Sequence, residues 1–118
     1  MSGGNWKEMF HAACEGDLAL VEYHVKAGVD TNYADPEFLA TPLVASILAG
    51  QAEVALFLLG NGANPHLLSE FDGLTPIQAA RKKGMNQVEL KLVSLGVQPV
   101  AAKPAPRSWL LRWLRSAA

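Results

Sequence analysis

Glycine recurs through this chain of 118 residues at a fixed spacing of 34 residues. Two sets of glycines share this spacing: Gly16, Gly50 and Gly84, and Gly28, Gly62 and Gly96. A fixed period of about 20–50 residues is typical of a stack of similar units, not of a single globular core. Because such stacks present extended surfaces, the period favours binding over catalysis as the function class.

Each unit is predicted to form two short helices joined by a tight turn. Thr41-Pro42 and Thr75-Pro76 lie 34 residues apart, and each pair indicates a helix start with threonine as the cap and proline at the first position. Asn5 is the expected cap in the first unit. Glycines of the two sets end the helices, as C-terminal glycines do. The predicted helices are 6–14, 18–26, a helix from Pro42 ended by Gly50, 52–59 stopped by Gly60, Asn61 and Gly62, a helix from Pro76 ended by Gly84, and 88–94.

These motifs resemble the ankyrin repeat. Thr41-Pro42-Leu43 and Thr75-Pro76-Ile77 correspond to its Thr-Pro-Leu start, and Gly28-Val29-Asp30 and Gly62-Ala63-Asn64 correspond to its Gly-Ala-Asp exit. The histidine that usually follows Thr-Pro-Leu is replaced in the three units, and the residues in its place are Phe10, Val44 and Gln78.

The resemblance covers residues 5–98 and implies an all-α solenoid of three helix-turn-helix units. The units are 5–38, 39–72 and 73–98 within a domain of residues 1–98, followed by a Pro/Ala linker at 99–106 and an amphipathic basic helix at 107–118. Long connections join the units; residues 29–40 form the first finger and residues 63–74 the second. With only three units, the end units are expected to act as caps.

In proteins of this family the fingers and the ends of the first helices form a concave binding face. The resemblance therefore implies a non-enzymatic protein-interaction module, an adaptor or regulator of a protein partner. The implied partner-binding residues are Tyr33, Asp35, Glu37, Phe38, Leu48, Glu70, Phe71, Asp72, Lys82 and Lys83. Phe38 and Phe71 either fold onto the adjacent unit or stay exposed for a partner. The acidic residues either keep the loops soluble or meet a basic surface, and Lys82 and Lys83 also suit the end of a helix dipole.

Charge is divided unevenly along the chain. Residues 1–98 hold six Lys/Arg against eleven Asp/Glu, a balance of −5, whereas residues 99–118 hold four Lys/Arg and no acid, a balance of +4. An acidic body argues against nucleic acid as a partner.

The basic C-terminal segment carries an apolar face on a helical projection. The residues expected to dock through this face are Trp109, Leu110, Trp113 and Leu114. They either cap the third unit or dock on a partner or a membrane surface. Two further function classes stay open: a peripheral membrane tether that uses this helix with weak affinity, and an inhibitor or immunity-type protein that blocks an enzyme.

Side chains for chemistry are few. His11, His24 and His66 fall in different units, and Cys14 is the only cysteine. His24 shares a column with Leu58 and is expected to be a packing residue. We therefore expect no catalytic residue, no cofactor and no metal site. With no disulfide partner, no signal peptide and no apolar run of membrane-spanning length, the chain is expected to be a cytoplasmic monomer, and peripheral membrane contact through the C-terminal helix stays open.

Overall fold

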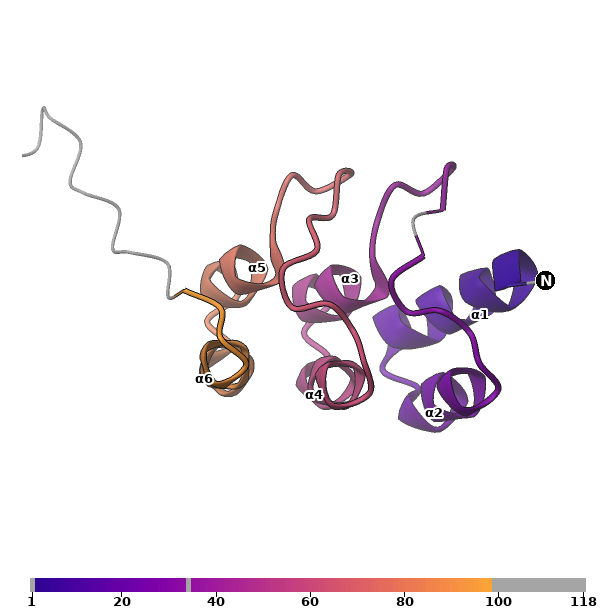
Figure 1. Cartoon of the computed structure of the whole chain (residues 1–118), viewed down its shortest axis with the longest axis horizontal. Helices are drawn as coiled ribbons and strands as arrows, with labels where there is room; N and C mark the ends of the chain where they lie inside the picture. Colours follow the sequence, from indigo (N-terminus) through magenta and orange to yellow (C-terminus); the bar gives the residue numbers. More distant parts are fainter. Residues whose placement is uncertain (1, 34, 99–118) are drawn as a thin grey trace, which may run out of the picture.

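The repeat period in the sequence corresponds to a repeat in space. The computed structural model describes residues 2–33 and 35–98, which contain six helices and no strand beyond an isolated antiparallel bridge between Ser69 and Leu74. The helices are α1 (Ser2–Glu15), α2 (Leu18–Lys26), α3 (Pro42–Leu48), α4 (Ala52–Gly60), α5 (Pro76–Lys82) and α6 (Asn86–Ser94). Odd-numbered helices form one layer, even-numbered helices the other, and both fingers project beyond the odd-numbered layer (Figure 1). The all-α solenoid fold is confirmed.

The tight turn inside each unit depends on a glycine with a positive φ angle. Gly50 follows α3 with φ +81°, a conformation that side chains with a Cβ rarely adopt. The N–H of Gln51 then donates to the carbonyl of Ser46 (2.9 Å), and α4 begins at the next residue. This turn reverses the chain, so α4 packs back on α3.

Threonine and proline set the starts of α3 and α5 as expected. Thr41 caps α3 by accepting a hydrogen bond from the N–H of Val44 at Oγ1 (3.2 Å). Thr75 caps α5 in the same way, and the Gln78 side chain accepts a hydrogen bond from the N–H of Thr75 (3.0 Å), which completes a capping box. Gln78 therefore stabilises its own helix start.

Three predicted helix ends were wrong by a few residues. Asn5 lies inside α1, which begins at Ser2, because no Thr-Pro pair forces the first unit to start its helix at one position. Gly60 belongs to α4 instead of stopping it, and the chain leaves the helix at Asn61. The last helix begins at Asn86, two residues before the predicted start at Val88.

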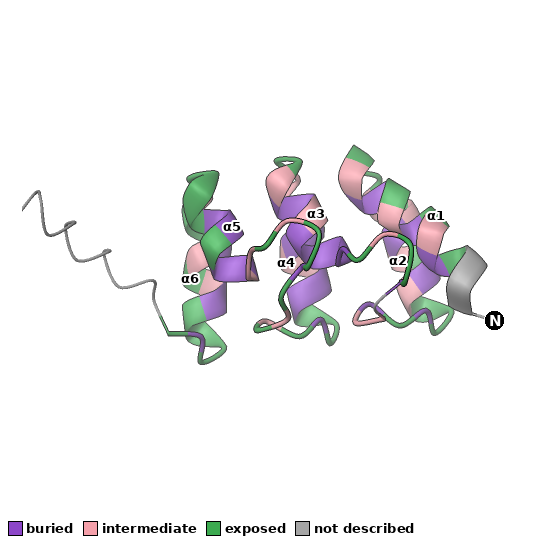
Figure 2. Cartoon of the chain, turned by 90° about the horizontal axis from the view of Figure 1, so that it is seen from above, coloured by how far each residue is buried: buried purple, intermediate pink, exposed green. Residues whose placement is uncertain are grey.

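The core is a continuous apolar layer between the two rows of helices (Figure 2). Trp6, Met9, Ile47, Leu58 and Leu92 are its largest fully buried side chains. His24 lies in the column of Leu58 and Leu92 and is buried with them, as a packing residue should be.

Side-chain hydrogen bonds tie neighbouring units together at their exits. The amide nitrogen of Asn32 donates to the carbonyl of Gly62 (2.9 Å), and its amide oxygen accepts from the N–H of Asn64 (2.7 Å). Gln51 donates to the carbonyl of Cys14 (3.2 Å) at the other side of the stack. These bonds fix the spacing of the first two units, from which the fingers project.

Asn32→Ala is expected to lower the free energy of unfolding by about 1–2 kcal/mol, because it leaves two backbone groups without their partner. Urea denaturation followed by circular dichroism measures the change. His66→Ala is the matched control, since His66 occupies the same place one unit later and its exposed side chain makes no hydrogen bond within the described residues. Equal losses for the two variants would contradict the assigned role of Asn32.

Candidate functional site

A buried aspartate shapes the first finger. The carboxylate of Asp35 accepts hydrogen bonds from the N–H groups of Glu37 (2.8 Å) and Phe38 (3.2 Å), and its side chain is almost fully covered. The N–H of Leu39 donates to the carbonyl of Asp35 (2.9 Å), and Leu39 takes φ +54°. Asp35 therefore builds the turn that presents Glu37 and Phe38.

Phe38 folds back onto the first unit, which decides one of the two alternatives left open for it. Its ring centroid lies 5.5 Å from Trp6 and 5.1 Å from Phe10, both at steep interplanar angles. Trp6 stacks on Phe10 (5.1 Å) and meets Tyr33 edge-on (6.0 Å). The finger is thus anchored by an aromatic cluster whose central ring, Trp6, is fully buried.

The second finger holds its aromatic residue outward. The Ser69 hydroxyl donates to the carboxylate of Asp72 (2.7 Å), and the N–H of Gly73 donates to the carbonyl of Ser69 (2.8 Å). The N–H of Phe71 donates to the carbonyl of Leu39 (2.9 Å), a direct bond between the fingers. Phe71 itself is 76% exposed.

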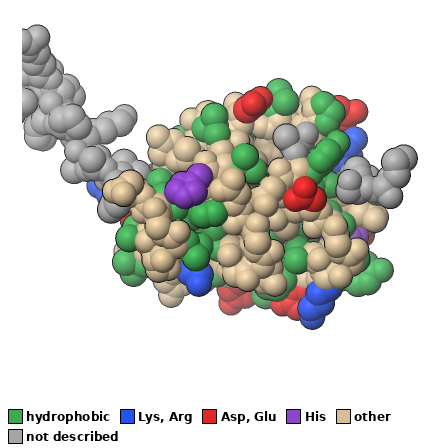
Figure 3. Space-filling view, in the orientation of Figure 1, with side chains coloured by type: hydrophobic (Ala, Val, Ile, Leu, Met, Phe, Trp, Pro, Cys, Tyr) green, Lys and Arg blue, Asp and Glu red, His purple; other side chains and the backbone are tan. Residues whose placement is uncertain are grey.

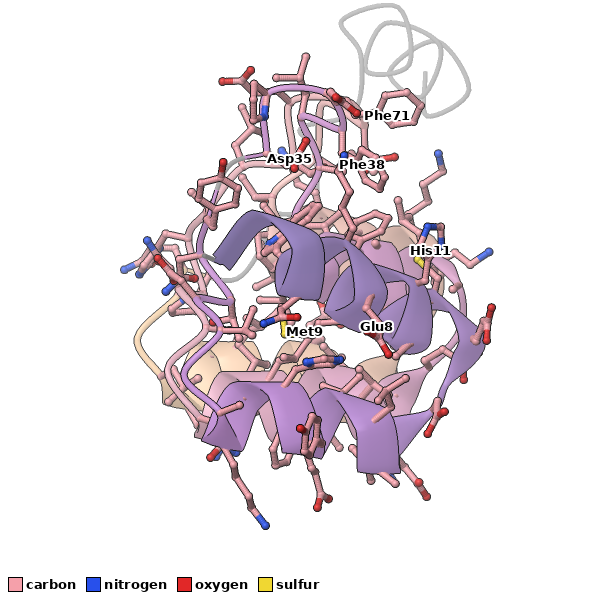
Figure 4. The ribbon with its side chains drawn as sticks, turned by 90° about the vertical axis from the view of Figure 1, so that its right-hand side faces the viewer. Glu8, Met9, His11, Asp35, Phe38 and Phe71 are labelled. Carbon is pink, nitrogen blue, oxygen red and sulfur yellow. The ribbon has the colours of Figure 1, made fainter. Side chains whose placement is uncertain are left out.

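A hollow lies between the two fingers, with a volume of about 330 Å³. We call it the finger groove, and it is lined by Phe10, Glu37, Phe38, Ala40 and Phe71. Figure 4 shows Phe71 close to Phe38 at the finger end of the molecule. Its size lies at the lower end of the range for small-molecule pockets, so it has room for one or two side chains of a partner.

The two fingers that form this groove are acidic, and one acid, Glu37, lies in its lining. The two fingers carry five Asp/Glu and no Lys/Arg. Glu37 is paired with Lys7 across the groove's outer edge (3.1 Å), and the hydrogen bond from Lys7 to this carboxylate raises the pKa of the lysine. Glu70 is exposed on the second finger. In the space-filling view, acidic and hydrophobic side chains lie side by side over the fingers (Figure 3).

Known proteins with related sequences identify the repeat type. No family model matches the chain. It is 31% identical over 91 residues to YahD of Escherichia coli (strain K12), which is described as an ankyrin repeat protein; the match covers 71% of this chain and 44% of YahD. It is also 31% identical over 68 residues to the 2-5A-dependent ribonuclease of Mus musculus, a match of 58% of this chain and 9% of that protein. The chain is an ankyrin-repeat protein. It spans less than half the length of either relative.

The ankyrin fold brings some of the predicted binding residues together and separates others. Glu37, Phe38 and Phe71 meet in the finger groove, whereas Asp35 and Asp72 direct their carboxylates into the turns. Four more lie away from the groove lining: half-buried Tyr33 beside Trp6, half-buried Leu48 on α3, and exposed Lys82 and Lys83 at the end of α5. Trp109, Leu110, Trp113 and Leu114 lie outside the described residues.

Two groove residues were missed by the sequence prediction, namely Phe10 and Ala40. Phe10 occupies the column of Val44 and Gln78, where ankyrin repeats usually carry histidine at the base of the finger. The signal that could have predicted it was the aromatic side chain of Phe10 at this repeat position, one unit before the finger that carries Phe71.

The described residues hold little that could perform chemistry. They contain no group of three or more His, Cys, Asp or Glu placed to hold a metal ion. Burial raises the pKa of the Cys14 thiol, helped by the charges of Asp72 and Glu15, so the thiolate is disfavoured. Within 2–33 and 35–98, the helices are too short and too polar to cross a bilayer.

Proposed function

We propose that this ankyrin-repeat protein is a non-enzymatic adaptor or regulator that binds a protein partner through the finger groove. The observation that carries the proposal is the exposure of Phe71 at the rim of an apolar groove. Contiguous exposed apolar patches mark interaction sites on monomers, and aromatic anchors dominate the energetics of interfaces.

The chemistry of the groove supports one kind of partner. Apolar walls from Phe10, Phe38 and Ala40 suit a large apolar or aromatic side chain. The acidic residues of the fingers, of which Glu37 and Glu70 are exposed, suit a neighbouring lysine or arginine. We infer a peptide segment of the partner in which an aromatic or leucine anchor has basic residues beside it.

The groove needs little rearrangement to bind. Phe38 is held by the aromatic cluster, Glu37 by the Asp35 turn, and the second finger by the bond from Phe71 to Leu39. Contacts that are already ordered reduce the entropy lost on association. A rigid groove of this kind supports selective binding of one sequence pattern.

Selection of a random peptide library on the full chain tests this proposal. We expect the enriched peptides to share an aromatic or leucine anchor flanked by Lys or Arg. Phe71→Asp is expected to weaken their binding at least about tenfold, because the anchor loses its apolar contact and meets a carboxylate. Isothermal titration calorimetry with one enriched peptide measures the difference.

Leu68→Asp is the matched control, since Leu68 lies in the same finger, is 46% exposed and does not line the groove. It should leave peptide binding within about twofold of wild type, as expected for a residue outside the hot spot. Equal weakening by both substitutions, or enrichment of acidic peptides, would overturn the proposal.

The open alternatives make different predictions. A membrane tether depends on residues 107–118, which lie outside the described residues, and would bind anionic vesicles without any contribution from Phe71. An enzyme inhibitor would use the same fingers but recognise a folded active site, so short peptides would fail to enrich.

A further inference from the structure

The finger groove and the C-terminal end of the chain have complementary chemistry. The groove has apolar walls, and the two fingers carry five acids and no Lys/Arg, although Lys7 of α1 pairs with one of these acids, Glu37. Residues 107–115 combine Trp109, Leu110, Trp113 and Leu114 with three arginines and no acid. This composition is the pattern inferred above for the partner: large apolar anchors with basic neighbours.

We propose that residues 107–115 dock into the finger groove of their own chain and compete there with the partner. The proposal rests on the proposed function of the groove as a docking surface. In this proposal the C-terminal segment is an internal ligand, and the partner must displace it from the finger groove.

The other exposed apolar surface fits this segment poorly. At the C-terminal end of the described stack, α6 and its C-cap residue expose Leu90 (70%), Val93 and Leu95. The third unit, however, carries four Lys/Arg, and Glu89 is its only acid. Glu89 is paired with Arg81 (3.4 Å), just as Glu37 at the groove is paired with Lys7 (3.1 Å), so the difference between the two surfaces lies in their remaining charges. A basic segment would be repelled there, whereas the acidic fingers attract it.

The linker is long enough for docking within one chain. Eight residues, 99–106, separate the last described residue from Arg107. An extended chain spans about 3.1 Å per residue, so these residues reach about 25 Å. Packed helices lie about 8–10 Å apart, which places the groove between the first two fingers about 20 Å along the stack from the third unit. The fingers also project from the layer opposite α6 (Figure 1), so the segment reaches the groove of its own chain only with a nearly fully extended linker.

Docking within the chain has a consequence for partner affinity. A tethered segment meets its site at a high effective concentration, so even weak contacts keep the groove largely filled. If the segment occupies the groove in about nine molecules out of ten, the apparent affinity for a partner peptide falls about tenfold.

A nitroxide label at the end of the full chain tests where the segment lies. The label is attached to Ser116→Cys in a Cys14→Ala background, and broadening of backbone amide signals is measured by NMR. We expect the signals of Phe38, Ala40 and Phe71 to broaden. Phe71→Asp should abolish this broadening, whereas Leu90→Asp, at an equally exposed position on α6, should leave it unchanged.

Three results would overturn the proposal. Broadening centred on Leu90 and Val93 would show that the segment caps the stack, and the absence of broadening would show that it docks nowhere on the repeats. Broadening that appears only between labelled and unlabelled copies in a mixed sample would show that the occupant is a second chain.

Charge reversal separates this inference from the proposed function. Arg112→Glu with Arg115→Glu should abolish the broadening and strengthen peptide binding about tenfold, since the internal competitor is removed. The peptide selection is therefore also carried out on this double variant. If peptides bind the wild-type chain and the double variant equally well, the C-terminal segment does not compete with them, but the proposed function of the groove still holds. Failure to enrich peptides on either chain overturns the proposed function, whatever the label reports.

Discussion

Trp6→Ala is expected to lower the free energy of unfolding by about 3–5 kcal/mol, the range for removal of a buried tryptophan. Trp6 is fully buried at the base of the first finger and contacts Phe10, Tyr33 and Phe38 through its ring. Small domains are stable by only about 5–15 kcal/mol, so this loss is a large fraction of the total. Thermal and urea denaturation measure it.

The same substitution should disable the finger groove. Phe10 and Phe38 line the groove and both pack on Trp6, so its loss removes the support beneath the groove walls. Peptide binding should therefore fall even under conditions where the variant remains folded. A Trp6→Ala chain that is folded and binds peptide normally would contradict this dependence.

Trp6→Phe keeps the experiment informative if the alanine variant fails to fold. The indole Nε1–H of Trp6 is buried, and the described residues provide no hydrogen-bond partner for it. Phenylalanine removes this unsatisfied donor, which offsets part of the packing that is lost. We therefore expect a loss of less than about 1.5 kcal/mol, as for swaps that keep a core residue apolar and close in size.

Phe71→Ala is the control for these two variants. It removes an exposed ring and should leave the free energy of unfolding within about 0.5 kcal/mol of wild type.

Leu58→Ala should lower the free energy of unfolding by about 2–5 kcal/mol because it leaves a cavity in the middle unit. Leu58 is fully buried in α4, which packs against α3 within its unit and against α2 and α6 in the neighbouring units. The cavity therefore weakens both interfaces that hold the stack together. The change is measured from the midpoint of urea denaturation at a constant m-value.

Leu90→Ala makes the same chemical change on an exposed part of α6 and is the matched control. It should alter stability by no more than about 0.5 kcal/mol. If Leu90→Ala proved as costly as Leu58→Ala, the C-terminal end of the described stack would have to be covered in solution. That outcome would favour capping by the C-terminal segment over its docking in the finger groove.

The backbone plan of the repeats was predictable because its signals are local. Thr41-Pro42 and Thr75-Pro76 specify helix starts through hydrogen bonds and a fixed φ within a few residues. Gly50 and Gly62 specify turns through positive φ angles that other residues rarely adopt. Where such a local signal was lacking, at the start of α1, the predicted cap at Asn5 was wrong. The spacing of 34 residues then determined the order and register of the units.

The fate of the finger side chains was decided only by the tertiary structure. Phe38 and Phe71 occupy loops of similar composition, yet Phe38 packs on Trp6 and Phe71 faces solvent. The difference arises because the first unit offers an aromatic surface beneath its finger, while Phe71 is held outward by its backbone bond to Leu39 in the preceding finger. The sequence by itself determined the repeat and its turns, since these depend on neighbours along the chain. The groove formed by Phe10, Phe38 and Phe71 depends on contacts between units, and these contacts exist only once the units are stacked.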